Sequence, residues 1–288
     1  MMRIPDLKWL TVALFCLMSL ASGAQAQDFS KKQRAEIRRF ASNNSLFVLY
    51  HEIGHLLFHQ LEMPVLGREE DAADNMATWT LLSQGTKEAN RALSDAAQGW
   101  VLSGVAYDSG GEESDYAENH SLDKQRAYQI VCLMVGMDQK SFGPIANEYR
   151  IDSDRQDTCQ WDYDTVDNSL RRLLGAAGHK RGQGTDVIVQ YHEPGSGLEA
   201  AADAFKSSGV FDQVADELRR NYNLKQAVAF NAQRCGEANA FYDPETVEVI
   251  FCYELMQDYM DLYSSNLTTS EDAVLQQTGP GKIKKNKL

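Results

Sequence analysis

The feature that most constrains this chain is the segment His51-Glu52-Ile53-Gly54-His55, which lies in an apolar stretch from Leu46 to Leu61. In an α-helix, residues four apart lie on the same face, so His51 and His55 can bind one metal ion. Glu52 would then point toward the open side of that ion. This is the ligand arrangement of a zinc hydrolase. The alternative is that both histidines are ordinary helix residues, but unpaired imidazoles and a buried carboxylate are costly inside an apolar helix.

A third protein ligand is needed, because catalytic zinc sites use three protein ligands and a water. His59 follows the first motif histidine by eight residues, which is about 12 Å along a helix axis and too far to share one ion. We therefore predict Glu70, on the following helix, as the third ligand. Asp74, one turn later, is predicted to accept the second ring N–H of a ligand histidine. Glu69 and Asp71 point about 100° to either side of Glu70 and are the weaker alternatives.

Glu52 is predicted to be the catalytic base, because a carboxylate beside the metal but not bound to it can take a proton from the attacking water. A further donor must stabilise the oxyanion that forms on the substrate. We predict His120 for this catalytic role, since it lies in a polar segment just before a helix. The alternative is that His120 and Arg126 only tie this loop to the helix by hydrogen bonds.

Three stretches add to this motif. They are Leu49 to Leu57 with Pro64 to Asp74, Asn119 to Arg126 with Cys132, and Cys235-Gly236 and Asn239 to Pro244 with Cys252 to Leu255. Together they resemble a family of bacterial metallopeptidases whose members generally carry signal peptides. The resemblance covers most of the chain and implies a gluzincin-like zinc peptidase fold. From the metal motif we expect Zn²⁺ as the cofactor and a peptide or protein as the substrate.

The first 26 residues have the pattern of a secretory signal peptide. Arg3 and Lys8 precede an apolar run from Leu10 to Leu20, and Ala24-Gln25-Ala26 provides the small residues of a cleavage site. The mature chain would begin at Gln27, in the periplasm or outside the cell. A membrane anchor is the alternative, but the apolar run is shorter than the ~20 residues that span a bilayer. We therefore expect no stable anchor after cleavage.

Charge and cysteine content narrow the possible partners and the compartment. The formal net charge is -13, and such a surface repels the phosphates of nucleic acids and anionic lipids. We expect no nucleic-acid partner. Four cysteines follow the predicted signal peptide, an even number in a compartment that permits disulfides. Of the three possible pairings, we predict Cys132 with Cys159 and Cys235 with Cys252, because each pair brackets a short local unit.

The spacing of apolar residues predicts an α+β fold that is mostly helical. Helices are expected at 35–41, 46–61, 68–82, 88–103, 122–135, 161–174, 198–205, 211–222 and 253–263, with a capping or kinking signal at 43–45. Strands are expected at 186–191, 226–232 and 246–252, with a turn at 242–245. The last strand could form the exposed edge of a substrate groove, or it could be a buried central strand stapled by a disulfide.

A glycine-rich segment from Gly175 to Gly184 is a candidate boundary between two lobes. We predict a helical zinc-binding lobe at 27–178, an α/β lobe at 179–270 packing on it, and a disordered tail at 271–288. Zinc hydrolases with this motif usually rest the metal helix on a small sheet, but too few mature residues precede His51 to build one. We therefore hypothesise a zincin-like fold in permuted order, in which the C-terminal strands supply the sheet. The alternative is an independent C-terminal domain.

Two further functions compete with an exported zinc peptidase. One is a zincin-like periplasmic binding or scaffold protein that keeps the metal without turnover. The other is hydrolysis of a non-peptide amide, such as one in the cell wall. Glu52 favours an enzyme over a binding protein, because a purely structural metal site has no use for an unligated carboxylate at that position.

Overall fold

The computed structural model describes residues 29–176 and 184–278, and in these ranges the chain is α+β and mostly helical, as predicted. The helices are α1 (Lys31–Gln60), α2 (Glu69–Gln84), α3 (Lys87–Ala106), the 3₁₀ helix η1 (Glu113–Ala117), α4 (Asp123–Met137), α5 (Gln139–Glu148), α6 (Ser153–Ala176), α7 (Glu199–Ser208), α8 (Val210–Asn221) and α9 (Tyr253–Thr278). The strands are β1 (Val187–Tyr191), β2 (Val228–Gln233), β3 (Ala240–Asp243) and β4 (Glu248–Cys252). Within the described ranges, no helix combines the length and the apolarity that a membrane-spanning segment needs. The predicted signal peptide and residues 279–288 lie outside them.

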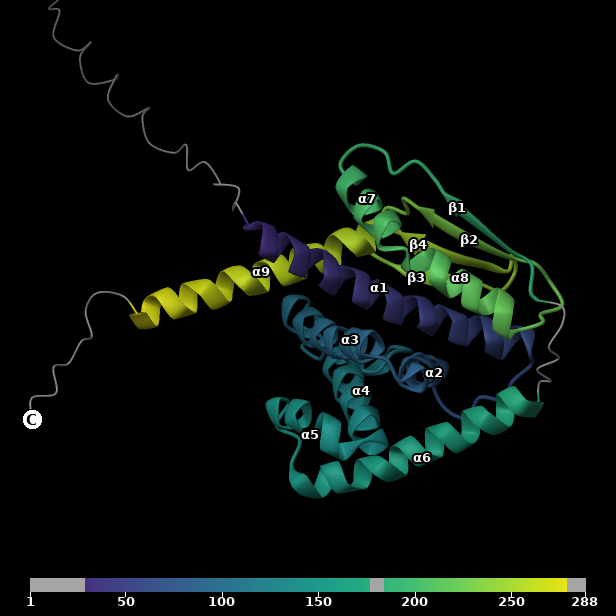
Figure 1. Cartoon of the computed structure of the whole chain (residues 1–288), viewed down its shortest axis with the longest axis horizontal. Coiled ribbons are helices and arrows are strands. Elements are labelled where there is room, and N and C mark those ends of the chain that lie inside the picture. Colours follow the sequence, from purple (N-terminus) through teal and green to yellow (C-terminus); the bar gives the residue numbers. More distant parts are fainter. Residues whose placement is uncertain (1–28, 177–183, 279–288) are drawn as a thin grey trace, which may run out of the picture.

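Helix α1 lies in the middle of the molecule, between the sheet with α8 on one side and α2 to α6 on the other (Figure 1). A capping box between Ser30 and Gln33 begins it. The kink predicted at 43–45 is absent from this helix. Asn44 Nδ2 donates to the carbonyl oxygens of Phe40 (2.9 Å) and Asp95 (3.1 Å), and Ser45 Oγ donates to the carbonyl of the residue four before it. Because these side chains are satisfied by backbone carbonyls, the helix continues through them.

The sheet has four strands in the order β1-β2-β4-β3. The first three strands of this order run parallel, and β3 pairs antiparallel with β4 at one edge. The turn predicted at 242–245 was therefore placed too early, because Tyr242 and Asp243 belong to β3. The chain turns only after Asp243, whose Oδ1 accepts the N–H of Glu245 at 2.8 Å. Strand β4 is therefore a central strand held by the Cys235–Cys252 disulfide, which was the alternative to an exposed groove edge.

The sheet lies against α1, which contacts β3, β4, α7 and α8. Its inner face is aromatic. The rings of Phe205 and Phe251 stack with centroids 3.8 Å apart, and Phe211 and Phe230 pack beside them. All four side chains are fully buried. This burial fixes the C-terminal strands beside the helix that carries the two motif histidines.

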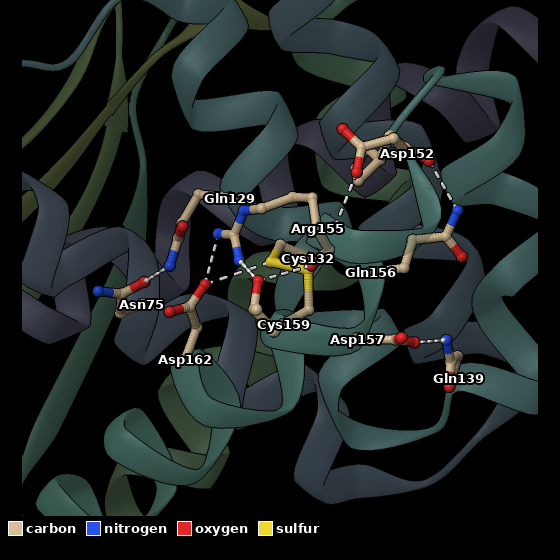
Figure 2. Close-up of a disulfide and its surroundings, with 12 residues drawn as sticks. Asn75, Gln129, Cys132, Gln139, Asp152, Arg155, Gln156, Asp157, Cys159 and Asp162 are labelled. Atoms are coloured by element: carbon tan, nitrogen blue, oxygen red, sulfur yellow. Dashed lines mark hydrogen bonds and ion pairs between the residues drawn. A yellow bond between two sulfur atoms is a disulfide. The ribbon is translucent and has the colours of Figure 1, made fainter.

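Two disulfides join the pairs predicted from the sequence. Cys132–Cys159 links α4 to α6, next to the hydrogen bond between Gln129 and Asn75 (Figure 2). Cys235–Cys252 links the segment before β3 to the end of β4. The Glu254 carboxylate accepts the backbone N–H groups of Cys235 and Gly236 in the same segment. The entry to β3 is therefore held at three points.

Helices α5, α6 and α9 differ most from the prediction. Helix α5 was not predicted, because Gly143 and Pro144 lie in its interior. Helix α6 begins at Ser153 rather than at 161, since Asp152 Oδ1 accepts the N–H of Arg155 at 2.9 Å and caps a first turn that carries few apolar residues. Helix α9 continues to Thr278, eight residues into the predicted disordered tail, because no glycine or proline interrupts it before 279.

Candidate metal centre

The site is built where α1 and α2 approach closely. Gly54, in the motif on α1, faces Ala73 on α2, and a Cβ added to Gly54 would lie 3.1 Å from the Cα of Ala73. Both residues are buried. Only a residue without a side chain permits this contact at its present distance. The contact brings the first turn of α2 beside the motif histidines.

Three donor atoms converge at this contact. His51 Nε2 lies 3.0 Å from His55 Nε2 and 3.1 Å from Glu70 Oε2, and His55 Nε2 lies 3.3 Å from the same oxygen. Ligands about 2.0–2.1 Å from a tetrahedral zinc ion are about 3.3 Å from one another. Two imidazole nitrogens and one carboxylate oxygen at these separations fit zinc, with one coordination position left for water. The described residues contain one other group of three possible metal ligands, and two of its members are the disulfide-bonded Cys132 and Cys159.

Carboxylates orient both histidines through their other ring nitrogens. His51 Nδ1 lies 2.8 Å from Asp74 Oδ1, and His55 Nδ1 lies 2.8 Å from Glu69 Oε1. These contacts favour the tautomer in which Nε2 is free to bind a metal. Asp74 therefore lies where the sequence predicted it, next to the second ring nitrogen of a motif histidine. Glu69, considered above only as an alternative ligand, contacts His55 instead.

Asp74 is held in turn by Arg126 from α4. Arg126 Nε and Nη2 donate to the two carboxylate oxygens of Asp74 at 2.7 and 2.8 Å, and its guanidinium lies 3.5 Å from the ring centroid of Trp100. Burial alone would raise the pKa of Asp74, but the charge and hydrogen bonds of Arg126 and the hydrogen bond to His51 hold it well below the ordinary value. Asp74 is therefore a buried anion with a fixed partner.

The pKa values of His51 and Glu70, two members of the donor set, are shifted strongly from their ordinary values. Burial opposes the charged form of His51, but hydrogen bonds to Asp74 and Glu70 raise its pKa to about 9. Burial likewise opposes ionisation of Glu70, but hydrogen bonds from His120, His51 and His55 hold its pKa far below the ordinary value. A proton on His51 thus occupies the place that a cation would take.

Glu52 lies beside this set and is buried, with 5% of its surface exposed. Burial raises the pKa of Glu52, while the nearby histidines and the backbone N–H of Tyr242, which donates to the carboxylate, act in the opposite direction. Strand β3 therefore helps to hold the carboxylate.

His120 reaches the site from the segment between η1 and α4. Its Nε2 lies 2.8 Å from Glu70 Oε2, and its ring stacks on that of His51 with centroids 6.2 Å apart. Arg68 Nη1 donates to the backbone carbonyl of His120 at 3.1 Å, which holds the segment. The imidazole is half exposed and faces open space rather than the protein core.

Two connected spaces open beside the donor set. The main cleft has a volume of about 1020 Å³ and is lined by His55, Glu70, His120 and Tyr242 among others. The side cavity, of about 380 Å³, shares His51, Glu52, His120 and Asn239 with the main cleft and continues between α3 and α9. A substrate can thus reach the donor set from solvent.

The sequence matches one protein family along most of its length. The match covers residues 11–174 and 191–282, and the family, DUF4344, has the description "putative metallopeptidase". The chain belongs to this family. Membership points to a metal-dependent peptidase, in agreement with the resemblance noted from the sequence motifs. No curated protein and no solved structure shows significant similarity to the chain.

The sequence argument did not place two further residues, Arg126 and Tyr242, beside the donor set. Arg126 carried a detectable signal, because it lies on the buried face of α4 with Ala127 and Ile130, and a charged residue in such a position needs a buried partner. Tyr242 lies in a stretch that carries the family resemblance, but its position beside Glu52 and its hydroxyl contact with His59 Nδ1 at 2.9 Å depend on the packing of β3 against α1, which is far away in the sequence.

Proposed function

We propose that this protein is an exported, zinc-dependent peptidase that hydrolyses peptide bonds with Glu52 as the general base. The observation that carries the proposal is the convergence of His51, His55 and Glu70, with donor atoms 3.0–3.3 Å apart, beside a buried carboxylate outside the donor set. A purely structural zinc site uses four protein ligands and needs no such carboxylate.

The chemistry requires a nucleophile, a base and a donor to the oxyanion. Zinc, when bound, lowers the pKa of a water ligand to about 7 and polarises the substrate carbonyl. Glu52 takes a proton from the attacking water and later delivers it to the leaving amine as the C–N bond breaks. Its raised pKa suits both steps, because a carboxylate with a higher proton affinity is a better base. The N–H of Tyr242 holds the carboxylate in place during both transfers.

His120 is the donor that we assign to the oxyanion. Its Nε2 is 2.8 Å from Glu70 Oε2 in the open cleft, close to where the substrate carbonyl would lie. An imidazole that donates to the developing negative charge stabilises the transition state more than the ground state. The histidine is also exposed enough to turn toward the substrate.

The edge strand β3 offers a way to hold an extended peptide. Ala240, Phe241 and Tyr242 line the main cleft, and β3 has a neighbouring strand on one side only. Peptides commonly bind by adding a strand to such an edge, with their side chains directed alternately into pockets. This geometry favours a peptide over a small non-peptide amide as the substrate.

Export is part of the proposal because two features agree with it. The N-terminal 26 residues have a signal-peptide pattern. The two disulfides require an oxidising compartment in which to form and persist. We assign the mature protein to the periplasm or the extracellular space.

Glu52→Gln tests the function. The variant is expected to retain one zinc per chain by metal analysis and to lose hydrolysis of a peptide library by at least about 10²-fold, since a general base contributes about 10²–10⁴-fold. Glu36→Gln, which makes the same change near the other end of α1, is the matched control. A chelator should abolish the wild-type cleavage, and zinc should restore it. Identical behaviour of Glu52→Gln and wild type in every assay would instead support a metal-keeping binding protein.

A further inference from the structure

The side cavity adjoins the point at which the proposed reaction would occur. It shares Glu52 and His120 with the main cleft, so a group inside it lies next to the bond that is cleaved. Its outer part is formed by Trp100 and Tyr107 from the end of α3 and by Asp258 from α9. A cavity of about 380 Å³ can hold one side chain of the substrate.

Besides His51, Glu52 and His120, two charged residues line this cavity, Arg126 and Asp258. Arg126 contributes to the wall, but it is buried and both oxygens of Asp74 accept its hydrogen bonds. Asp258 is half-buried and accepts a hydrogen bond from the hydroxyl of Tyr107. In the ranges that the structure describes, no lysine, arginine or histidine forms an ion pair with Asp258.

Asp258 therefore lines the cavity without a cationic partner among the described residues. Burial raises its pKa, and the like charge of Asp261 acts in the same direction. A cationic group that entered the cavity would favour the ionised carboxylate of Asp258 and so act against both effects. The apolar wall formed by Val48, Trp100 and Leu255 suits the hydrocarbon part of a long side chain.

We propose that the side cavity is a subsite for a basic side chain, lysine or arginine, next to the cleaved bond, with Asp258 as its counter-ion. The alkyl stem lies along Trp100 and the charged end meets Asp258 and the Tyr107 hydroxyl. This inference rests on the proposed peptidase function, since it names the substrate class of that site. It makes Asp258 a specificity-determining residue with no part in the chemistry.

Cleavage of matched peptides tests the subsite. Peptides that differ only in lysine, arginine, norleucine or glutamate on either side of one bond are compared by kcat/KM, and the products are sequenced. We expect lysine or arginine to exceed norleucine by about tenfold or more on one side of the bond, the range of a charge-assisted contact in a partly buried site. Asp258→Asn should bring the lysine-to-norleucine ratio close to one. Asp203→Asn, which removes an exposed acid on α7 outside the cavity, should leave the ratio unchanged.

Binding gives a second readout that does not depend on turnover. In the Glu52→Gln background, a fluorescent lysine peptide should bind about tenfold more tightly than its norleucine counterpart, and adding Asp258→Asn should remove the difference. If Asp258→Asn does not fold, as judged by its thermal unfolding, Asp258→Ser takes its place.

The outcomes separate the two proposals. Equal cleavage and equal binding of lysine and norleucine peptides overturn the subsite and leave the peptidase function standing. A lysine preference that persists in Asp258→Asn overturns the role of Asp258. Selective binding that needs Asp258, without cleavage of any peptide by the zinc-loaded wild type, overturns the peptidase function and retains the basic subsite.

Discussion

The Nδ1 atom of His51 lies 2.8 Å from Oδ1 of Asp74, an oxygen that also accepts a hydrogen bond from Arg126. A histidine that donates to a carboxylate presents its other nitrogen, Nε2, to the donor set. The metal ligand, its acceptor and the guanidinium behind it form a chain that crosses from α1 through α2 to α4. The position of one ligand therefore depends on the packing of three helices.

Asp74→Asn should weaken zinc binding. The amide preserves the shape of the carboxylate but removes its charge, and changes of this kind typically cost 10–100-fold in metal affinity, about the loss we expect here. Zinc dissociation constants from competition with a chelator measure the effect. Asp71→Asn, on the same helix, is the control and should bind zinc like wild type. An unchanged dissociation constant in Asp74→Asn would show that the carboxylate does not support the ligand.

Arg126→Met should destabilise the protein, because it leaves the Asp74 carboxylate buried without its partner. Removal of one member of a buried ion pair costs about 3–5 kcal/mol in the free energy of unfolding. Urea unfolding of the wild type, both single variants and Arg126→Met/Asp74→Asn measures it. The double variant should lose less than the sum of the two single losses, since each substitution relieves the charge left by the other. Additive losses would argue against direct coupling.

Much of the donor set could be predicted from the sequence because its parts are local. His51 and His55 share one helix, and their spacing alone puts them on one face. Glu70 was the hardest of the three, because it depends on how α2 packs against α1. In the structure that packing rests on the contact between Gly54 and Ala73, which the sequence analysis did not use.

The surroundings of the site could not be predicted in the same way. Strand β3 has only four residues and follows a polar segment, so no period-two pattern announced it. Its position follows from pairing with β4, from the Cys235–Cys252 disulfide and from the packing of β4 on α1. The packing of β4 on α1 joins segments far apart in the sequence, and local propensity carries no information about it. The continuity of α1 through Asn44 was missed for a related reason, since its partner Asp95 lies on α3.

Gly54→Ala should disturb the site through the backbone. The added methyl would lie 3.1 Å from the Cα of Ala73, closer than ordinary contacts, so α2 must move away from α1. Overpacking of this kind costs about 1–3 kcal/mol, and we also expect weaker zinc binding because Glu70 moves with α2. Thermal unfolding and zinc titration check both effects. Gly175→Ala, in α6 with no neighbour within 4 Å of the added atom, should be neutral or slightly stabilising.

Zinc binding should strengthen with pH, because the metal must displace a proton from His51. Hydrogen bonds to Asp74 and Glu70, working against burial, raise the pKa of this imidazole to about 9, and only the neutral ring binds zinc. The affinity should therefore rise about tenfold per pH unit from about pH 7 to 9 and level off above that. Competition with a chelator of known pH dependence measures the slope. Asp74→Asn removes a hydrogen bond that favours the proton, so its affinity should level off at a lower pH. A dissociation constant that stays the same from about pH 7 to 9 in the wild type would mean that no proton competes with the metal at His51.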